Sequence, residues 1–105
     1  MLSALEQLEK WYVARCDGLW EHTWGVEIGT LDNPGWRVRI NLNETPQDGA
    51  ALEMVKIERS DRDWIFYWAA ENQFQIACGP ENLSEAIQLF IEWFESDHDR
   101  LGPKP

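Results

Sequence analysis

The chain of 105 residues is 44% hydrophobic and 27% charged, which is typical of one globular domain with a core of its own. Its formal net charge of -10 at pH 7 argues against direct binding to DNA or RNA, because an acidic surface repels phosphates. No apolar run approaches the roughly 20 residues that a membrane span needs, and the N-terminus lacks the features of an export signal. We therefore expect one cytoplasmic domain over residues 1–105, with no contact to nucleic acid or membrane.

The first predicted element is a helix over residues 3–16. Ser3 and Glu6 match a capping box, in which the hydroxyl and the carboxylate each accept a backbone amide at the start of a helix. Gly18 suits the position just after a helix, where the backbone turns left-handed. The apolar stripe of this helix is formed by Leu5, Leu8, Trp11 and Tyr12.

Alternating apolar residues next predict a β-hairpin. One strand covers residues 22–30, the other runs from Trp36 to Leu42, and the turn lies at residues 31–35. A single register satisfies both the apolar face and one charge pair. It sets Ile28 opposite Val38, Val26 opposite Ile40, Trp24 opposite Leu42 and Glu27 opposite Arg39.

Three further strands are predicted over residues 52–59, 63–70 and 73–78. The apolar residues of the first change parity midway, which predicts a bulge or burial on both faces. The other two form a second hairpin around the Glu71–Asn72 turn, where asparagine tolerates a positive φ. Its register sets Tyr67 opposite Ile76, Ala69 opposite Phe74 and Ile65 opposite Cys78.

The other face of this second hairpin holds large aromatic residues beside glutamines. Trp64, Phe66 and Trp68 share that face with Gln73 and Gln75. Glutamine side chains are poorly suited to a sealed core. We interpret the three aromatic residues as a surface ridge.

The last predicted element is a helix that starts after Asn82 as N-cap and ends near Ser96. Glu85 and Glu92 belong to its polar face, and residues 97–105 form a polar, frayed tail. Its apolar stripe comprises Leu83, Ala86, Ile87, Phe90, Ile91 and Phe94.

The order of these elements predicts an α+β fold. It consists of an N-terminal helix, a five-stranded, mainly antiparallel twisted sheet and a C-terminal helix. Two amphipathic helices need a sheet face to cover, so both are expected on one face, with the other face open.

The stretch between the first helix and the first strand is the best candidate for chemistry. Asp17, Glu21 and His22 could form a general acid/base pair or bind a metal, as in a small hydrolase or metal-dependent enzyme. They are better explained as a hydrogen-bonded corner that joins the first helix to the hairpin, or as a contact to a partner. Sequence motifs of nucleophilic or zinc enzymes are missing, and His98 is far along the chain. We predict no catalytic residues, no metal ligands and no cofactor.

Several motifs in the chain resemble the immunity protein 53 family of bacterial polymorphic toxin systems. The resemblance extends from about residue 8 to residue 94. It rests on Trp11-Tyr12, Cys16-Asp17-Gly18, Trp20-Glu21-His22, Gly25, Thr30 to Trp36, and Gly79-Pro80-x-Asn82-Leu83. The resemblance implies a cytosolic antitoxin, not an enzyme, that binds and blocks a cognate toxin.

An acidic surface favours a basic toxin, such as a nuclease, and seven tryptophans supply residues common in binding hot spots. We expect the protein to be a monomer or a weak homodimer. A small hydrolase or metal-dependent enzyme remains the alternative. The predicted partner-binding residues are Trp20, Glu21, His22, Trp64, Phe66, Trp68, Glu85 and Glu92.

Overall fold

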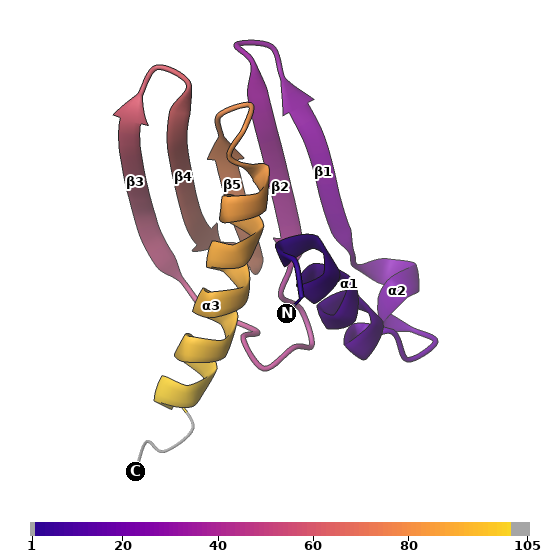
Figure 1. Ribbon diagram of the computed structural model, residues 1–105. Coiled ribbons are helices and arrows are strands. Elements are labelled where there is room, and N and C mark those ends of the chain that lie inside the picture. The colour runs from indigo at the N-terminus through magenta and orange to yellow at the C-terminus, as the bar shows by residue number, and fades with distance from the viewer. Residues whose placement is uncertain (1, 102–105) are drawn as a thin grey trace.

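The computed structural model describes the backbone of residues 2–101 and the side chains of residues 2–96. Within this part of the chain, two long helices and a short helical turn accompany one antiparallel sheet (Figure 1). In chain order the elements are α1 (Ala4–Arg15), α2 (Trp20–Thr23), β1 (Val26–Leu31), β2 (Gly35–Asn41), β3 (Leu52–Ser60), β4 (Asp63–Ala70), β5 (Gln73–Cys78) and α3 (Leu83–Leu101).

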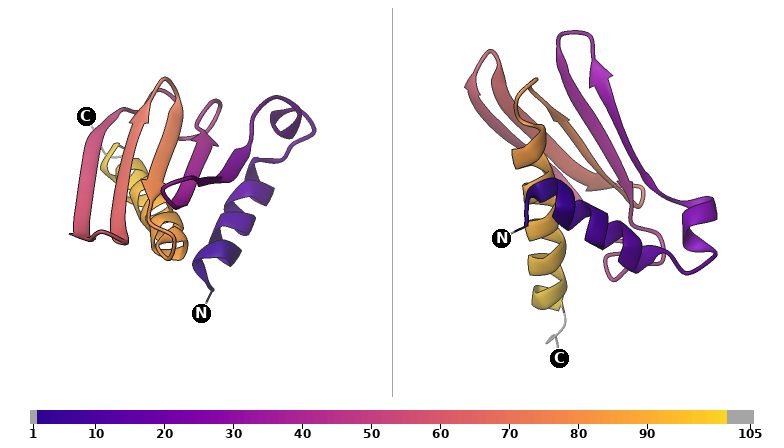
Figure 2. Two further views of the ribbon diagram at one scale, coloured as in Figure 1. Left: turned by 90° about the horizontal axis from the view of Figure 1, so that it is seen from above. Right: turned by 45° about the vertical axis from the view of Figure 1, so that its right-hand side comes forward.

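The five strands form one sheet in the order β1-β2-β5-β4-β3, and every neighbouring pair is antiparallel. α1 and α3 lie on the same face of this sheet, and the other face is uncovered by either helix (Figure 2). The predicted α+β architecture is therefore confirmed, including the placement of both long helices on one side.

Both predicted hairpin registers are confirmed. In the first hairpin Ile28 lies opposite Val38 and Glu27 lies opposite Arg39. In the second hairpin Tyr67 lies opposite Ile76, and the turn residues Glu71 and Asn72 have φ values of 54° and 63°. Two adjacent residues with positive φ give the turn a twist that matches the flanking strands. The other predicted pairs that form are Val26 with Ile40, Ala69 with Phe74, and Ile65 with Cys78.

The edge strand β3 is irregular, as its blurred apolar pattern predicted. Its register with β4 shifts between Leu52 and Val55 and again between Glu58 and Ser60. An extra residue in one strand turns the following side chains to the opposite face. This explains why Leu52 and Ile57, of different parity, both pack against the core.

The predicted strand over residues 22–30 is too long at its N-terminal end. Residues 20–23 form the helical turn α2, and β1 begins only at Val26. The predicted pair of Trp24 with Leu42 therefore lies outside the ladder. Trp24 instead ends the turn, with its backbone N–H donating to the carbonyl of Trp20 at 2.8 Å.

α1 has the predicted capping box but buries a narrower stripe than predicted. Ser3 and Glu6 each accept the other's backbone amide, at 3.1 Å and 2.9 Å. Leu8 and Trp11 are buried as expected, whereas Leu5 and Tyr12 are 54% and 38% exposed. The reason is that α1 packs its Trp11 flank against α3, so the opposite flank has no neighbouring helix.

α3 runs to Leu101, beyond the predicted end near Ser96. Its last residues are polar, so apolar periodicity could not reveal that the helix continues. Residues 97–101 of the predicted tail are therefore helical, whereas their side chains, that of His98 included, and the whole of residues 102–105 lie outside the described part of the chain.

The core lies between the sheet and the two long helices. Trp11, Phe74 and Phe90 meet at its centre, with ring centroids of Phe90 at 5.2 Å from Trp11 and 5.0 Å from Phe74. Such edge-to-face contacts add to the free energy gained by burying the rings. Cys16 and Cys78 are free thiols, and burial raises the pKa of Cys78 to about 11.

Candidate functional site

The stretch from Asp17 to Glu21 forms a compact corner between α1 and β1. One carboxylate oxygen of Asp17 accepts the backbone amides of Leu19 and Trp20, each at 2.9 Å. The carboxylate of Glu21 reaches back to the amides of Asp17 and Gly18, at 3.0 Å and 2.9 Å. The two acidic side chains thus hold the turn closed from both of its ends.

These hydrogen bonds also fix the charge state of the corner. The amides of Trp20 and Leu19 lower the pKa of the Asp17 carboxyl below its usual 3.8. Backbone amides likewise lower the pKa of Glu21 below 4.5. Both carboxylates are therefore ionised at neutral pH, as acceptors of backbone amides are expected to be.

This geometry does not favour the enzyme alternative. The oxygens of Asp17 and Glu21 are occupied by backbone amides, and neither carboxylate shares a hydrogen bond with His22 within residues 2–96. His22 is exposed on α2. Among the described residues, no group of three or more His, Cys, Asp and Glu side chains is arranged to hold a metal ion. The two carboxylates therefore stabilise the corner, and at its surface His22 is exposed and Glu21 is partly exposed.

Trp20, predicted as a partner contact, belongs to the core instead. Its side chain is 2% exposed, and its indole N–H donates to the carbonyl of Asn43 at 2.8 Å. Its ring lies 6.0 Å from that of Trp11 in an edge-to-face arrangement. Trp20 therefore joins the corner to α1 and to the loop after β2, and presents almost no surface to a partner.

The aromatic ridge of Trp64, Phe66 and Trp68 lies on β4, on the sheet face away from α1 and α3. Ile65 and Ala69 alternate with these residues and are buried under the helices. The three ridge side chains are half-buried and stand outside the core cluster. The ring centroids of Trp64 and Phe66 are 5.2 Å apart. The three side chains therefore share the open face of the sheet, where Trp64 and Phe66 are in contact.

Charged residues of both signs flank the aromatic ridge, with Glu58 opposite Trp64 and Lys56 opposite Phe66. The Lys56 ammonium lies 5.6 Å from the centre of the Phe66 ring. On the other side of the ridge, β2 places Arg37 and Arg39 opposite Ala77 and Gln75 of β5. The alternation of β2 around Val38 would have been sufficient to predict that both arginines face the open side. The open face therefore carries both signs of charge, and Arg39 pairs there with Glu27 at 3.7 Å.

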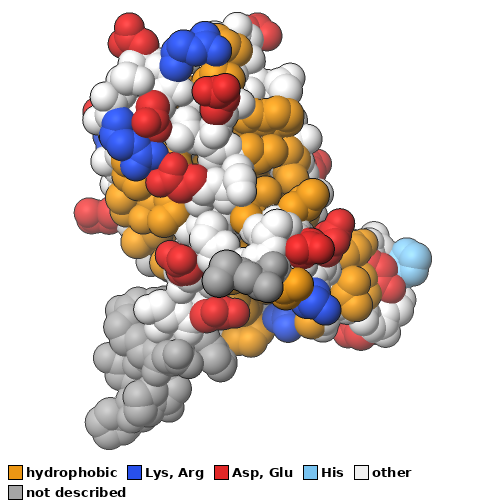
Figure 3. Space-filling model, viewed as in Figure 1, with side chains coloured by type: hydrophobic (Ala, Val, Ile, Leu, Met, Phe, Trp, Pro, Cys, Tyr) orange, Lys and Arg blue, Asp and Glu red, His pale blue; other side chains and the backbone are white. Residues whose placement is uncertain are grey.

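Acidic side chains are spread over the helix side of the molecule (Figure 3). Glu85, in the first turn of α3, pairs with Arg59 of β3 at 2.6 Å between Oε1 and Nη2. Glu92 is exposed two turns further along the helix and accepts a bond from Gln88 at 3.4 Å. Glu92 is thus freer to meet a partner than Glu85.

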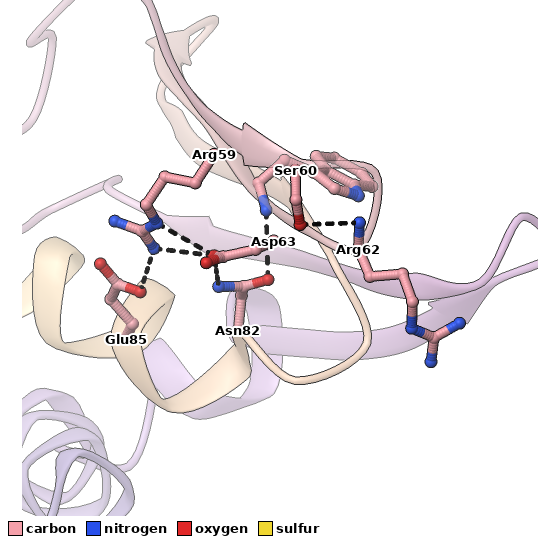
Figure 4. A network of polar contacts seen from close by, with 7 residues as sticks. Arg59, Ser60, Arg62, Asp63, Asn82 and Glu85 are labelled. Atoms are coloured by element: carbon pink, nitrogen blue, oxygen red, sulfur yellow. Dashed lines mark hydrogen bonds and ion pairs between the residues drawn. The ribbon is translucent and has the colours of Figure 1, made fainter.

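A polar network connects the β3–β4 hairpin to the start of α3 (Figure 4). Arg59 binds Asp63 at 3.0 Å as well as Glu85, and these two partners keep the pKa of its guanidinium above its usual value. Asn82 donates to Asp63 at 2.9 Å and accepts the amide of Trp64 at 3.3 Å. Since Trp64 starts the aromatic ridge, this network fixes the ridge relative to α3.

The part of the chain that the structure describes contains no helix with the length and apolar character needed to cross a membrane. No curated protein and no solved structure matches the chain. A family model described as immunity protein 53 matches residues 5–95, which is most of the chain and includes all five strands and most of both long helices. This match shows that the chain belongs to the immunity protein 53 family.

Proposed function

We propose that this protein is an antitoxin that neutralises a cognate toxin by binding it in the cytoplasm of the cell that makes both. The observation that carries the proposal is the match of the immunity protein 53 model over residues 5–95. The geometry supports action by binding, because the carboxylates of the most enzyme-like cluster are engaged with backbone amides.

We infer that the toxin is basic, as a nuclease would be. A formal charge of -10 on 105 residues attracts a basic protein over distances beyond direct contact and speeds the encounter. The same charge opposes association of two copies of this chain, so the active form is a monomer or at most a weak homodimer.

The proposed contacts with the toxin are the accessible residues of the predicted set. Aromatic side chains on a surface supply large contact area at small cost in conformational entropy. Carboxylates at the rim contribute to the rate and specificity of association. The set comprises Glu21, His22, Trp64, Phe66, Trp68, Glu85 and Glu92.

Co-expression tests this function directly. The toxin domain encoded beside this gene should arrest growth when expressed alone, and expression of the immunity chain should restore growth. The two proteins should then purify together in a fixed ratio. Growth arrest that persists while the folded immunity chain accumulates, with no complex, would contradict the proposal.

A further inference from the structure

The two edges of the sheet differ in how they are protected against pairing with another chain. β3 has two register shifts and four charged residues, Glu53, Lys56, Glu58 and Arg59. β1 pairs with β2 without a shift over its six residues and has one charged residue, Glu27. Charges and bulges are the usual features that keep an edge strand from pairing. β1 is therefore the edge that is open to an added strand.

The backbone of β1 presents unused hydrogen-bonding groups along this edge. The amide of Asn41 donates to the carbonyl of Gly25 at 3.0 Å, so Gly25 forms a hydrogen-bonded pair with β2. In an antiparallel ladder, hydrogen-bonded pairs and non-hydrogen-bonded pairs alternate from one residue to the next. The amides and carbonyls of Val26, Ile28 and Thr30 consequently point away from β2. No side chain among residues 2–96 bonds to these groups, so they are available to a partner.

An apolar groove of 450 Å³ lies beside the start of β1, on the helix side. It exists because α1 leaves its outer flank unpaired, so that Tyr12 is 38% exposed, and Ile28 further along β1 is 40% exposed. Figure 3 shows hydrophobic side chains that neither helix covers in the region of β1 and β2. The groove is lined by Leu8, Glu9, Tyr12, Trp24, Gly25 and Val26.

We propose that β1 binds an extended segment of the basic toxin as an added antiparallel or parallel strand. This inference rests on the proposed function and specifies its contact. Side chains of the added strand that face the helix side would pack on Val26 and Ile28. A basic side chain facing the open side would meet Glu27, whose side chain is 76% exposed although it pairs with Arg39 at 3.7 Å, and Glu9 offers a second carboxylate in the groove. Main-chain pairing supplies affinity, and these alternating contacts supply specificity.

Charge decides between the toxin and a second copy of this chain as the occupant. A second copy would bring another -10 to the contact and would place its own acidic groups near Glu9 and Glu27. An added strand with lysine or arginine on its open-side face and apolar residues on its helix-side face would complement both Glu27 and the apolar pair Val26 and Ile28. The chemistry of β1 therefore selects a basic partner.

A matched pair of substitutions at the two edges tests this proposal. Ile28→Lys and Met54→Lys each replace a large exposed apolar side chain, at 40% and 47% exposure, and each changes the net charge by one unit in the same direction. Only Ile28→Lys alters the β1 edge. With a catalytically inactive form of the neighbouring toxin domain as probe, Ile28→Lys should weaken binding at least about tenfold, and Met54→Lys by less than about threefold.

Hydrogen exchange gives a second readout that does not depend on a variant. The amides of Val26, Ile28 and Thr30 should exchange fast in the free protein and should become protected when the toxin domain binds.

Thermal unfolding of both lysine variants shows whether each is folded.

The outcomes separate this proposal from the proposed function. Wild-type protein that does not bind the toxin overturns both. Binding that survives Ile28→Lys, with no protection of the three amides, overturns only the β1 contact. If Phe66→Thr then abolishes binding, the toxin docks on the aromatic ridge instead. Protection that grows with protein concentration in the absence of toxin would identify a second copy as the occupant, and would likewise overturn the proposal.

Discussion

At the scale of single residues, the corner between α1 and β1 depends on two ionised side chains, Asp17 and Glu21. Amide donors lower the folded-state pKa of both below the usual values of 3.8 and 4.5. A carboxyl whose pKa is lowered on folding stabilises the fold above its unfolded-state pKa. That stabilisation is lost as the pH falls through the folded-state pKa, because protons then bind to the folded protein as well.

The variant Glu21→Gln should lower Tm at pH 7, because it weakens the acceptance of the Asp17 and Gly18 amides. At an acidic pH below the folded-state pKa of Glu21 its effect should shrink, because the wild-type carboxyl itself is then protonated. Glu27→Gln is the control, with the same change of charge but only an exposed ion pair to Arg39 at 3.7 Å. Thermal unfolding followed by circular dichroism measures both. Equal shifts for the two variants at both pH values would contradict the assigned role of Glu21.

At the scale of secondary-structure elements, the junction of the β3–β4 hairpin with α3 depends on one buried amide. The Asn82 side chain is 6% exposed and satisfies both the Asp63 carboxylate and the Trp64 amide (Figure 4). Removing one partner from a buried hydrogen bond leaves the other groups desolvated and unpaired. The ridge residue Trp64 would then lose part of its positioning.

We expect Asn82→Ala to reduce the free energy of unfolding by about 1–3 kcal/mol. Ser84→Ala is the control, since Ser84 is exposed two residues later on the same helix and should change stability by less than about 0.5 kcal/mol. Urea unfolding monitored by tryptophan fluorescence gives both values. A loss for Asn82→Ala no larger than that of the control would show that the network does not stabilise the junction.

The sequence was most informative where two independent patterns agreed. The second hairpin was predicted to the residue, because its apolar alternation and the positive φ allowed at Asn72 point to one register. Periodicity failed at α2, where tertiary burial of Trp20 and two local carboxylates bend residues 20–23 into a helical turn. Periodicity also predicted too wide a buried stripe for α1. The spacing of apolar residues shows which side of a helix is apolar, but not how much of that side is covered by other elements.

The candidate surfaces could be predicted only in part, for a similar reason. The face of Trp64, Phe66 and Trp68 followed from strand alternation alone. The burial of Trp20 and the pairing of Glu85 with Arg59 depend on contacts between segments far apart in sequence, which no local pattern contains.

At the scale of the whole molecule, charge is unevenly distributed. The chain carries 19 acidic and 9 basic residues, yet Arg37, Arg39 and Lys56 share the open face with the aromatic ridge. Glu27 and Glu58 lie on the same face, opposite Arg39 and Trp64, so a basic partner is attracted by the molecule as a whole and is not excluded from the open face. This agrees with the proposed contact at the β1 edge, beside Glu9 and Glu27.

The association rate with the toxin domain should accordingly fall steeply with salt, by at least about tenfold between roughly 0.05 M and 0.5 M NaCl. The dissociation rate should change much less, because short-range packing resists screening. Stopped-flow fluorescence of the tryptophans measures both rates. An association rate that is indifferent to salt would argue against a basic toxin.

The central claim, that this chain acts by binding a toxin, is tested most directly by calorimetric titration of the purified protein with the inactivated toxin domain encoded beside it. The account predicts saturation at a fixed molar ratio, with a Kd at or below about 10 nM, since neutralisation in a cell requires nearly complete occupancy. Titration of folded protein into folded toxin domain with no binding at micromolar concentrations would contradict it.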